Sequence, residues 1–190
     1  MSADDVLTAE QFAATRHELP DGGRWTELIA GRPVLLSPPS VEHGNAVLNL
    51  GKALADFSQS GQGGYACFDL GLVIARNPDT VLFPAACFFW TGAMFAESDK
   101  IVTEARPTLI VEVASSNDRR RGLTERIGGW LNWGASLVWL FDPHARTVHV
   151  FEKERAVQPL AEHEFLNGGS VLPGFQTSVG NLLKEPGWWK

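Results

Sequence analysis

A carboxylate inside an apolar segment is the residue of this sequence best suited to chemistry. Glu112 stands within Leu109-Ile-Val-Glu-Val113, an apolar run typical of a central strand covered on both faces. Because an unpaired buried charge is costly, Glu112 needs a cationic partner, a metal ion or a raised pKa. A polar loop and a predicted helix follow it, which is where open α/β sheets place their chemistry. The residues alone favour equally a reactive carboxylate and a structural ion pair with a nearby arginine.

Two further polar residues are candidates for the same site. Glu27 shares one face of a predicted strand with Trp25 and Ile29, which is an unexpected place for a carboxylate. His43 falls in the first turn of a predicted long helix, where it could contact a phosphate or Glu27. The ordinary alternatives are an exposed strand glutamate and a histidine bonded to the start of its own helix.

Hydrophobic periodicity and turn residues predict the elements that would position these side chains. A short helix follows the cap Thr8 and runs to about Glu18, and a hairpin follows it over residues 25–29 and 33–36. Longer helices are predicted over residues 41–58 and 122–133, and a final short one over 179–184. Strands are predicted over residues 65–74, 80–90, 108–114, 135–141 and 147–152. This order predicts one domain over residues 1–190, of either the mixed α/β or the α+β class.

Four segments carry a specific pattern, namely residues 77–89, 109–113, 123–126 and 137–148, with shorter matches at 7–12, 27–31, 36–43 and 172–175. In this order and spacing they resemble the Uma-two family of endonuclease-like proteins, within the PD-(D/E)XK nuclease superfamily. The resemblance implies a restriction-endonuclease-like core, a mixed β-sheet flanked by helices, preceded by an N-terminal helix and hairpin. It also implies magnesium-dependent hydrolysis of DNA, with Glu112, Arg126, Glu27 and His43 as candidate catalytic residues and Glu112 as the candidate metal ligand.

The sequence departs from the family at two chemically important positions. Pro84-Ala85 stands where the family has Pro-Asp, and Arg126 stands where it has lysine. Mg²⁺ needs several oxygen ligands, and a guanidinium keeps its charge but does not act as a base. We therefore expect weakened or lost activity, Mg²⁺ only in an active enzyme, and the methyl group of Ala85 facing Glu112 in one pocket.

Two alternatives to a weakened nuclease stay open. In one, Asp69 or Asp79 supplies the missing carboxylate and the enzyme is active. In the other, the scaffold is a non-catalytic module that binds DNA or protein, because a fold does not by itself fix a function.

The charge and the tail residues bear on partners. A net charge of −6 and a pI near 5.3 are unlike those of most nucleic-acid-binding domains. The basic cluster that could bind DNA is Arg119, Arg120 and Arg121, and its ordinary alternative is a solvated loop and helix start. Trp188 and Trp189 would form an exposed apolar patch, so a homo-oligomer, most simply a dimer, is predicted.

Other features predict a cytoplasmic protein without a membrane partner. The first residues do not resemble a signal peptide, and no apolar run is long enough to cross a bilayer. Cys67 and Cys87 both lie in apolar runs and are interpreted as small buried hydrophobes, since a disulfide between neighbouring strands would be unusual in the cytosol. No glycine-rich loop predicts nucleotide binding.

Overall fold

The larger of two main sheets forms the centre of the molecule. The computed structural model describes residues 6–116 and 120–187. The large sheet has the order β11-β10-β9-β8-β6-β3, in which β8 and β9 are parallel and every other pair is antiparallel. Its strands are β3 (Tyr65–Cys67), β6 (Ala86–Phe89), β8 (Leu109–Val113), β9 (Leu137–Asp142), β10 (Thr147–Glu152) and β11 (Gln158–Ala161).

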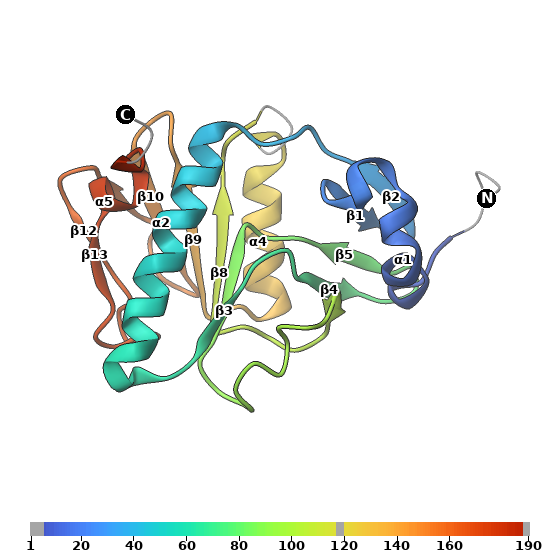
Figure 1. Ribbon diagram of the computed structural model, residues 1–190, viewed down its shortest axis with the longest axis horizontal. Helices are drawn as coiled ribbons and strands as arrows, with labels where there is room; N and C mark the ends of the chain where they lie inside the picture. The colour runs from blue at the N-terminus through green and yellow to red at the C-terminus, as the bar shows by residue number, and fades with distance from the viewer. Residues whose placement is uncertain (1–5, 117–119, 188–190) are drawn as a thin grey trace.

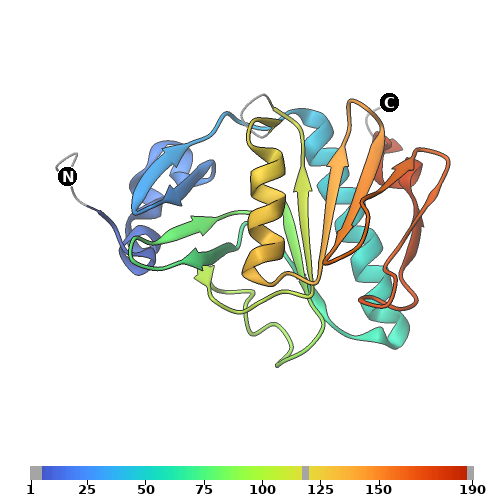
Figure 2. The same ribbon diagram turned by 180° about the vertical axis from the view of Figure 1, so that it is seen from behind.

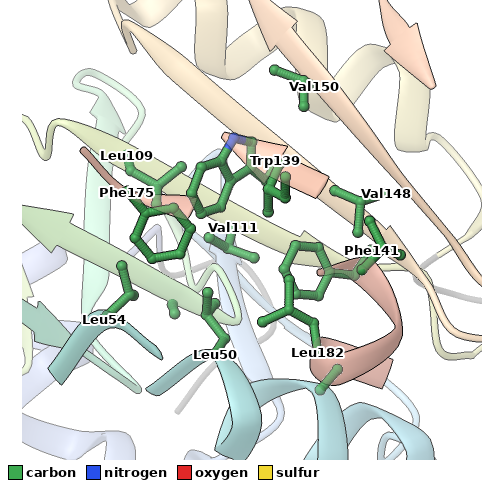
Figure 3. Close-up of a cluster of buried hydrophobic side chains, with 14 of the residues drawn as sticks. Leu50, Leu54, Leu109, Val111, Trp139, Phe141, Val148, Val150, Phe175 and Leu182 are labelled. Atoms are coloured by element: carbon green, nitrogen blue, oxygen red, sulfur yellow. The ribbon is translucent and has the colours of Figure 1, made fainter. Parts of the chain in front are cut away.

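Two helices cover opposite faces of the large sheet (Figures 1 and 2). Helix α2 (Val41–Phe57) packs Leu50 and Leu54 against Val111 and its neighbours on one face, as Figure 3 shows. Helix α4 (Leu123–Trp133) packs Trp130 against Ile110 on the other. Since side chains alternate along a strand, β8 places Val111 towards α2 and Glu112 towards α4.

A smaller sheet carries the N-terminal elements, and a third unit closes the other end of the molecule (Figure 1). The smaller sheet has the order β2-β1-β5-β4-β7, and helix α1 (Ala9–Thr15) packs against it. Thr8 and Gln11 form a reciprocal capping box at the start of this helix. Its strands are β1 (Thr26–Ile29), β2 (Arg32–Leu35), β4 (Gly71–Ala75), β5 (Thr80–Leu82) and β7 (Val102–Thr103). The third unit comprises β12 (Phe165–Asn167), β13 (Gln176–Ser178) and α5 (Val179–Leu183).

The predicted strands over residues 65–74 and 80–90 are each broken in two, and this is a correction to the sequence analysis. The chain leaves the large sheet after β3, builds β4 and β5 of the smaller sheet, and returns at β6. Asp69 has a positive φ of 54°, which a continuous strand does not allow. Pro84 has no backbone N–H to donate to a neighbouring strand. The two crossings between sheets therefore fall at residues 68–70 and 83–85.

The remaining predicted core elements agree with the structure within a few residues. The predicted order of helix, three strands, helix and strand is that of α2, β3, β6, β8, α4 and β9, once the strands of the smaller sheet are left aside. The first helix, α1, is shorter than predicted and ends at Thr15, because residues 16–18 form a 3-10 turn. In residues 6–116 and 120–187, no helix has the length and apolar character needed to span a membrane.

Truncating Leu50 should destabilise the fold much more than truncating Leu48 on the same helix. Leu50 is fully buried, whereas Leu48 is 47% exposed. Leu50→Ala should lower the free energy of unfolding by about 2–5 kcal/mol, because it leaves a cavity. Leu48→Ala should change it by no more than about 0.5 kcal/mol. Urea denaturation of dilute protein measures both, and equal effects would contradict the packing of α2.

Candidate active site

The guanidinium of Arg126 joins two carboxylates from different sheets. Its Nε donates to Oε1 of Glu112 at 2.7 Å. Its two terminal nitrogens donate to the carboxylate of Glu27 at 2.9 and 2.8 Å, in a bidentate fork. One of these nitrogens also donates to the carbonyl of Phe83 at 3.2 Å. The side chains are 17% exposed for Arg126 and 6% for each glutamate, so this triad is shielded from solvent.

The crossing between sheets explains how Glu27 reaches the large sheet. Glu27 lies on β1 of the smaller sheet, and Phe83 lies where the chain returns from β5 to β6. The backbone N–H of Phe83 donates to Oε1 of Glu27 at 2.9 Å. The same peptide segment thus donates to the carboxylate and accepts from Arg126. Through Arg126, these bonds fix the smaller sheet against Glu112 on β8, an interior strand of the larger one.

Glu112 is held by a second donor from α4. The indole Nε1 of Trp130 donates to Oε1 of Glu112 at 2.7 Å. Arg126 and Trp130 are four residues apart, a spacing that places both on one face of the helix. Sequence reasoning missed Trp130 as a site residue, and this spacing was the signal that could have found it.

Burial and the excess of carboxylates over guanidinium groups determine the pKa shifts of the site residues. Burial raises the pKa of Glu112, and attraction to Arg126 opposes that shift without cancelling it. Burial pushes the pKa of Arg126 down, but the charges of Glu112 and Glu27 more than compensate, so its pKa lies above the ordinary value. Two carboxylates and one guanidinium leave one negative charge when all are ionised. Arg126 is therefore a permanent cation beside a carboxyl that takes up a proton more readily than usual.

These residues do not fit a divalent cation in this arrangement. Mg²⁺ prefers oxygen ligands in an octahedral arrangement. In the described parts of the chain, no three His, Cys, Asp or Glu side chains gather in a way that could hold a metal ion. The nitrogens of Arg126 lie against oxygens of both glutamates, and a guanidinium cannot accept a cation. The donor set suits an internal ion pair.

The expectation that Ala85 faces Glu112 in one pocket is wrong. Ala85 lies at the bend before β6 and packs against the apolar cluster beneath α2, whereas Glu112 points towards α4. Ala85 shares a hollow with Glu27 and His43, and Glu112 shares another with Glu27 and Arg126. The strict alternation of a strand does not extend to a bend. Glu27 is therefore the carboxylate that lines both hollows.

His43 lies at the first hollow but contacts a different residue from those expected. Its Nδ1 forms a 3.0 Å hydrogen bond with the hydroxyl of Ser115, just beyond the end of β8. The structure thus brings together three of the predicted site residues, Glu112, Arg126 and Glu27, and places His43 at the neighbouring hollow, bonded to Ser115.

Neither candidate replacement carboxylate joins Glu112. Asp79 ion-pairs with Arg76 at 2.7 Å and accepts from the backbone N–H of Ala9 at 2.8 Å, which anchors α1. Asp69 does line the hollow of Ala85 and Glu27, but Arg16 holds it at 2.6 and 3.2 Å. Both carboxylates have structural cationic partners.

The arginine cluster is only in part available for a phosphate. Arg120 forms a bidentate pair with Asp142 at 2.9 and 2.6 Å. Arg121 is exposed and lines the hollow of Glu112. Arg119 lies outside the described residues. The pairing with Asp142 at the end of β9 accounts for an arginine in this loop without any nucleic acid.

Removing the charge of Arg126 should destabilise the protein strongly, and acid should reduce the effect. Arg126→Met leaves two buried carboxylates unpaired, so the free energy of unfolding near pH 7 should fall by about 3–5 kcal/mol. The pKa of Glu112 is already raised by burial, and loss of the cation raises it further. The folded state then binds protons that the unfolded state has lost, so stability rises as pH falls towards the unfolded pKa.

Urea denaturation near pH 7 and near pH 5 measures this difference. Arg121→Met, at an exposed position beside the same helix, is the control and should change stability by no more than about 0.5 kcal/mol. An Arg126→Met protein as stable as the control at both pH values would contradict the role of the triad.

Comparisons with known proteins agree with this architecture. The family model described as "Uma2: Putative restriction endonuclease" matches residues 10–180. A solved structure from Anabaena variabilis ATCC 29413, described as a putative nuclease belonging to DUF820, is similar with a TM-score of 0.71 and 18% sequence identity. The alignment covers 93% of this chain and 97% of that one. A search of curated proteins found no match. The chain has the nuclease-like fold that its sequence predicts, and it belongs to the Uma2 family of putative restriction endonucleases.

Proposed function

We propose that this protein is a nuclease-fold member of its family in which metal-dependent cleavage of DNA is weakened or lost. The observation that carries the proposal is the contact of one guanidinium with both site carboxylates, at 2.7 Å to Glu112 and 2.8 Å to Glu27. The side chain of Arg126 thus supplies the positive charge between Glu27 and Glu112.

The chemistry of phosphodiester cleavage explains the loss. A divalent metal ion stabilises developing charge and lowers the pKa of an attacking water. Arg126 can stabilise charge on a phosphate, but it cannot coordinate water or accept a proton. Ala85 supplies no oxygen, and His43 bonds to Ser115. The site retains electrostatic attraction for an anion only where Arg126 is released from its carboxylates.

The proposal predicts that the wild-type protein does not nick DNA in a metal-dependent way. Supercoiled plasmid incubated with Mg²⁺ or Mn²⁺ should be converted no faster by wild type than by Glu112→Ala. The Glu112→Ala preparation is also the control for contaminating nucleases. Robust cleavage by wild type that Glu112→Ala abolishes would overturn the proposal and support an active enzyme.

Restoring the family residues should create a metal site at Glu27, the carboxylate that lines both hollows. In Ala85→Asp/Arg126→Lys, the new carboxylate lies in the hollow that Glu27 lines, and lysine no longer bridges two glutamates with a fork. Calorimetric titration with Mn²⁺ should give measurable binding for this double variant and little for wild type. Arg121→Lys is the matched control. Unchanged binding in the folded double variant would count against this placement of the site.

A second candidate function is a non-catalytic module that binds protein, including a second copy of the chain. One observation favours it, an apolar groove along α2 that Leu48, Gly51, Ala55 and Phe68 line. Leu48 and Phe68 are 47% and 44% exposed, and exposed apolar patches often mark protein contacts. Trp188 and Trp189, for which a dimer contact was predicted, lie outside the described residues. The acidic net charge of −6 also suits a protein partner better than DNA.

If the chain forms a dimer through this groove, light scattering should give a molar mass twice that of the chain. Leu48→Glu should lower this mass towards the monomer value. Lys153→Glu, exposed and on a different surface turn, is the charge-changing control and should leave the mass unchanged. A monomer at every concentration tested would contradict the dimer.

A further inference from the structure

We propose that Cys67 and Cys87 form a peroxide-sensitive dithiol, which closes to a disulfide between the edge strand β3 and its neighbour β6. The pair is separate from the triad of Glu27, Arg126 and Glu112. The proposal therefore does not depend on any nuclease activity.

The strand register places the two cysteines directly opposite each other. Cys67 pairs with Cys87 in the antiparallel ladder of β3 and β6. Both side chains belong to the apolar cluster on the α4 face, so they point to the same side of the sheet. Directly opposed residues of antiparallel strands have Cα atoms about 4.5–5.5 Å apart. That separation falls within the range of about 4.4–6.8 Å that disulfides span.

The surroundings make the two thiols unequal. A hydrogen bond from Cys87 and another from Ser98 lower the pKa of Cys67, although burial opposes the shift. The same contact with Cys67, together with burial, raises the pKa of Cys87. Thiolate is the nucleophilic form. Cys67 also lies on the edge strand β3, whereas Cys87 lies on the interior strand β6. Together these features assign Cys67 as the attacking thiol and Cys87 as the one that resolves the intermediate.

The cover over Cys67 is a surface segment and not a core element. Ser98 and Glu97 come from the turns that follow β6, and the backbone N–H of Glu97 donates to the hydroxyl of Tyr65 at 3.2 Å. Phe95 in the same segment is 63% exposed. Cys67 itself is 5% exposed and Cys87 1%. A local opening of these turns exposes Cys67 first, as the order of attack requires.

The chemistry balances with hydrogen peroxide as the oxidant. The Cys67 thiolate attacks one peroxide oxygen, the O–O bond breaks, and the hydroxide that leaves takes up a proton to become water. The sulfur of Cys87 then attacks the sulfenic acid on Cys67, the S–S bond forms and the S–O bond breaks, which releases a second water. Two thiols are oxidised and one peroxide is reduced to two waters.

The link would close a loop that contains the wall of the candidate site. Residues 68–86 include β4, β5 and the second crossing, with Phe83, Pro84 and Ala85. A disulfide stabilises chiefly by constraining the unfolded chain. The oxidised protein should therefore unfold at a higher denaturant concentration than the reduced protein.

Intact mass spectrometry of the native wild-type chain after brief treatment with hydrogen peroxide tests the proposal. We expect a product lighter by two hydrogen atoms, a cross-linked peptide joining Cys67 to Cys87 in a non-reducing digest, and reversal by dithiothreitol. Oxidation confined to methionine, a disulfide that forms only in urea, or a link between two chains would overturn it.

Single variants test the order of attack. Cys87→Ser should accumulate a sulfenic acid on Cys67 that dimedone traps, whereas Cys67→Ser under the same treatment should give at least tenfold less adduct on Cys87. Equal trapping at both positions would overturn the assignment of Cys67 as the attacking thiol. If either variant fails to fold, the wild-type mass and peptide map still decide whether the pair closes.

Discussion

The buried contact of Arg126 with Glu27 and Glu112 links the two main sheets of the molecule. Each glutamate alone would be a charge removed from water, at a cost of several kcal/mol (about 3–5 when a partner is lost). The guanidinium compensates both, and Trp130 and Phe83 add hydrogen bonds to Oε1 of Glu112 and Oε1 of Glu27, two of the oxygens that Arg126 also contacts. Because Glu27 and Glu112 belong to different sheets, this one side chain also fixes how the sheets meet.

The fold and the site are linked through the two crossings between sheets. At the second crossing, residues 83–85 lie beside Glu27, and the backbone of Phe83 bonds to both Glu27 and Arg126. In this chain the side chain of Arg126 provides the positive charge between Glu27 and Glu112. Under our proposal this guanidinium stands where a metal ion would otherwise compensate the two carboxylates.

Sequence reasoning predicted the order of core elements and three of the residues that meet at the site. The continuous apolar run around Glu112 predicted a buried strand, and the apolar residues at helical spacing in α2 predicted a helix. Both patterns are clear because the residues that form them lie mostly in the core. The breaks at residues 68–70 and 83–85 were not predicted, since the apolar runs continue through them while the chain changes sheets. For the same reason the position of Ala85 was wrong: a bend determines its direction, and no periodicity describes a bend. The pairing of Arg120 with Asp142 depends on contacts between distant segments, which spacing alone does not reveal.

A crystal structure of the wild-type protein grown with excess Mn²⁺, with anomalous diffraction data, would show whether the guanidinium or a metal ion lies between the two carboxylates. We expect that Arg126 still bridges Glu27 and Glu112, and that no anomalous peak lies within bonding distance of either carboxylate, which for this class of ion is roughly 2.0–2.6 Å. An anomalous peak coordinated by Glu112, with the guanidinium of Arg126 displaced towards solvent, would contradict this expectation.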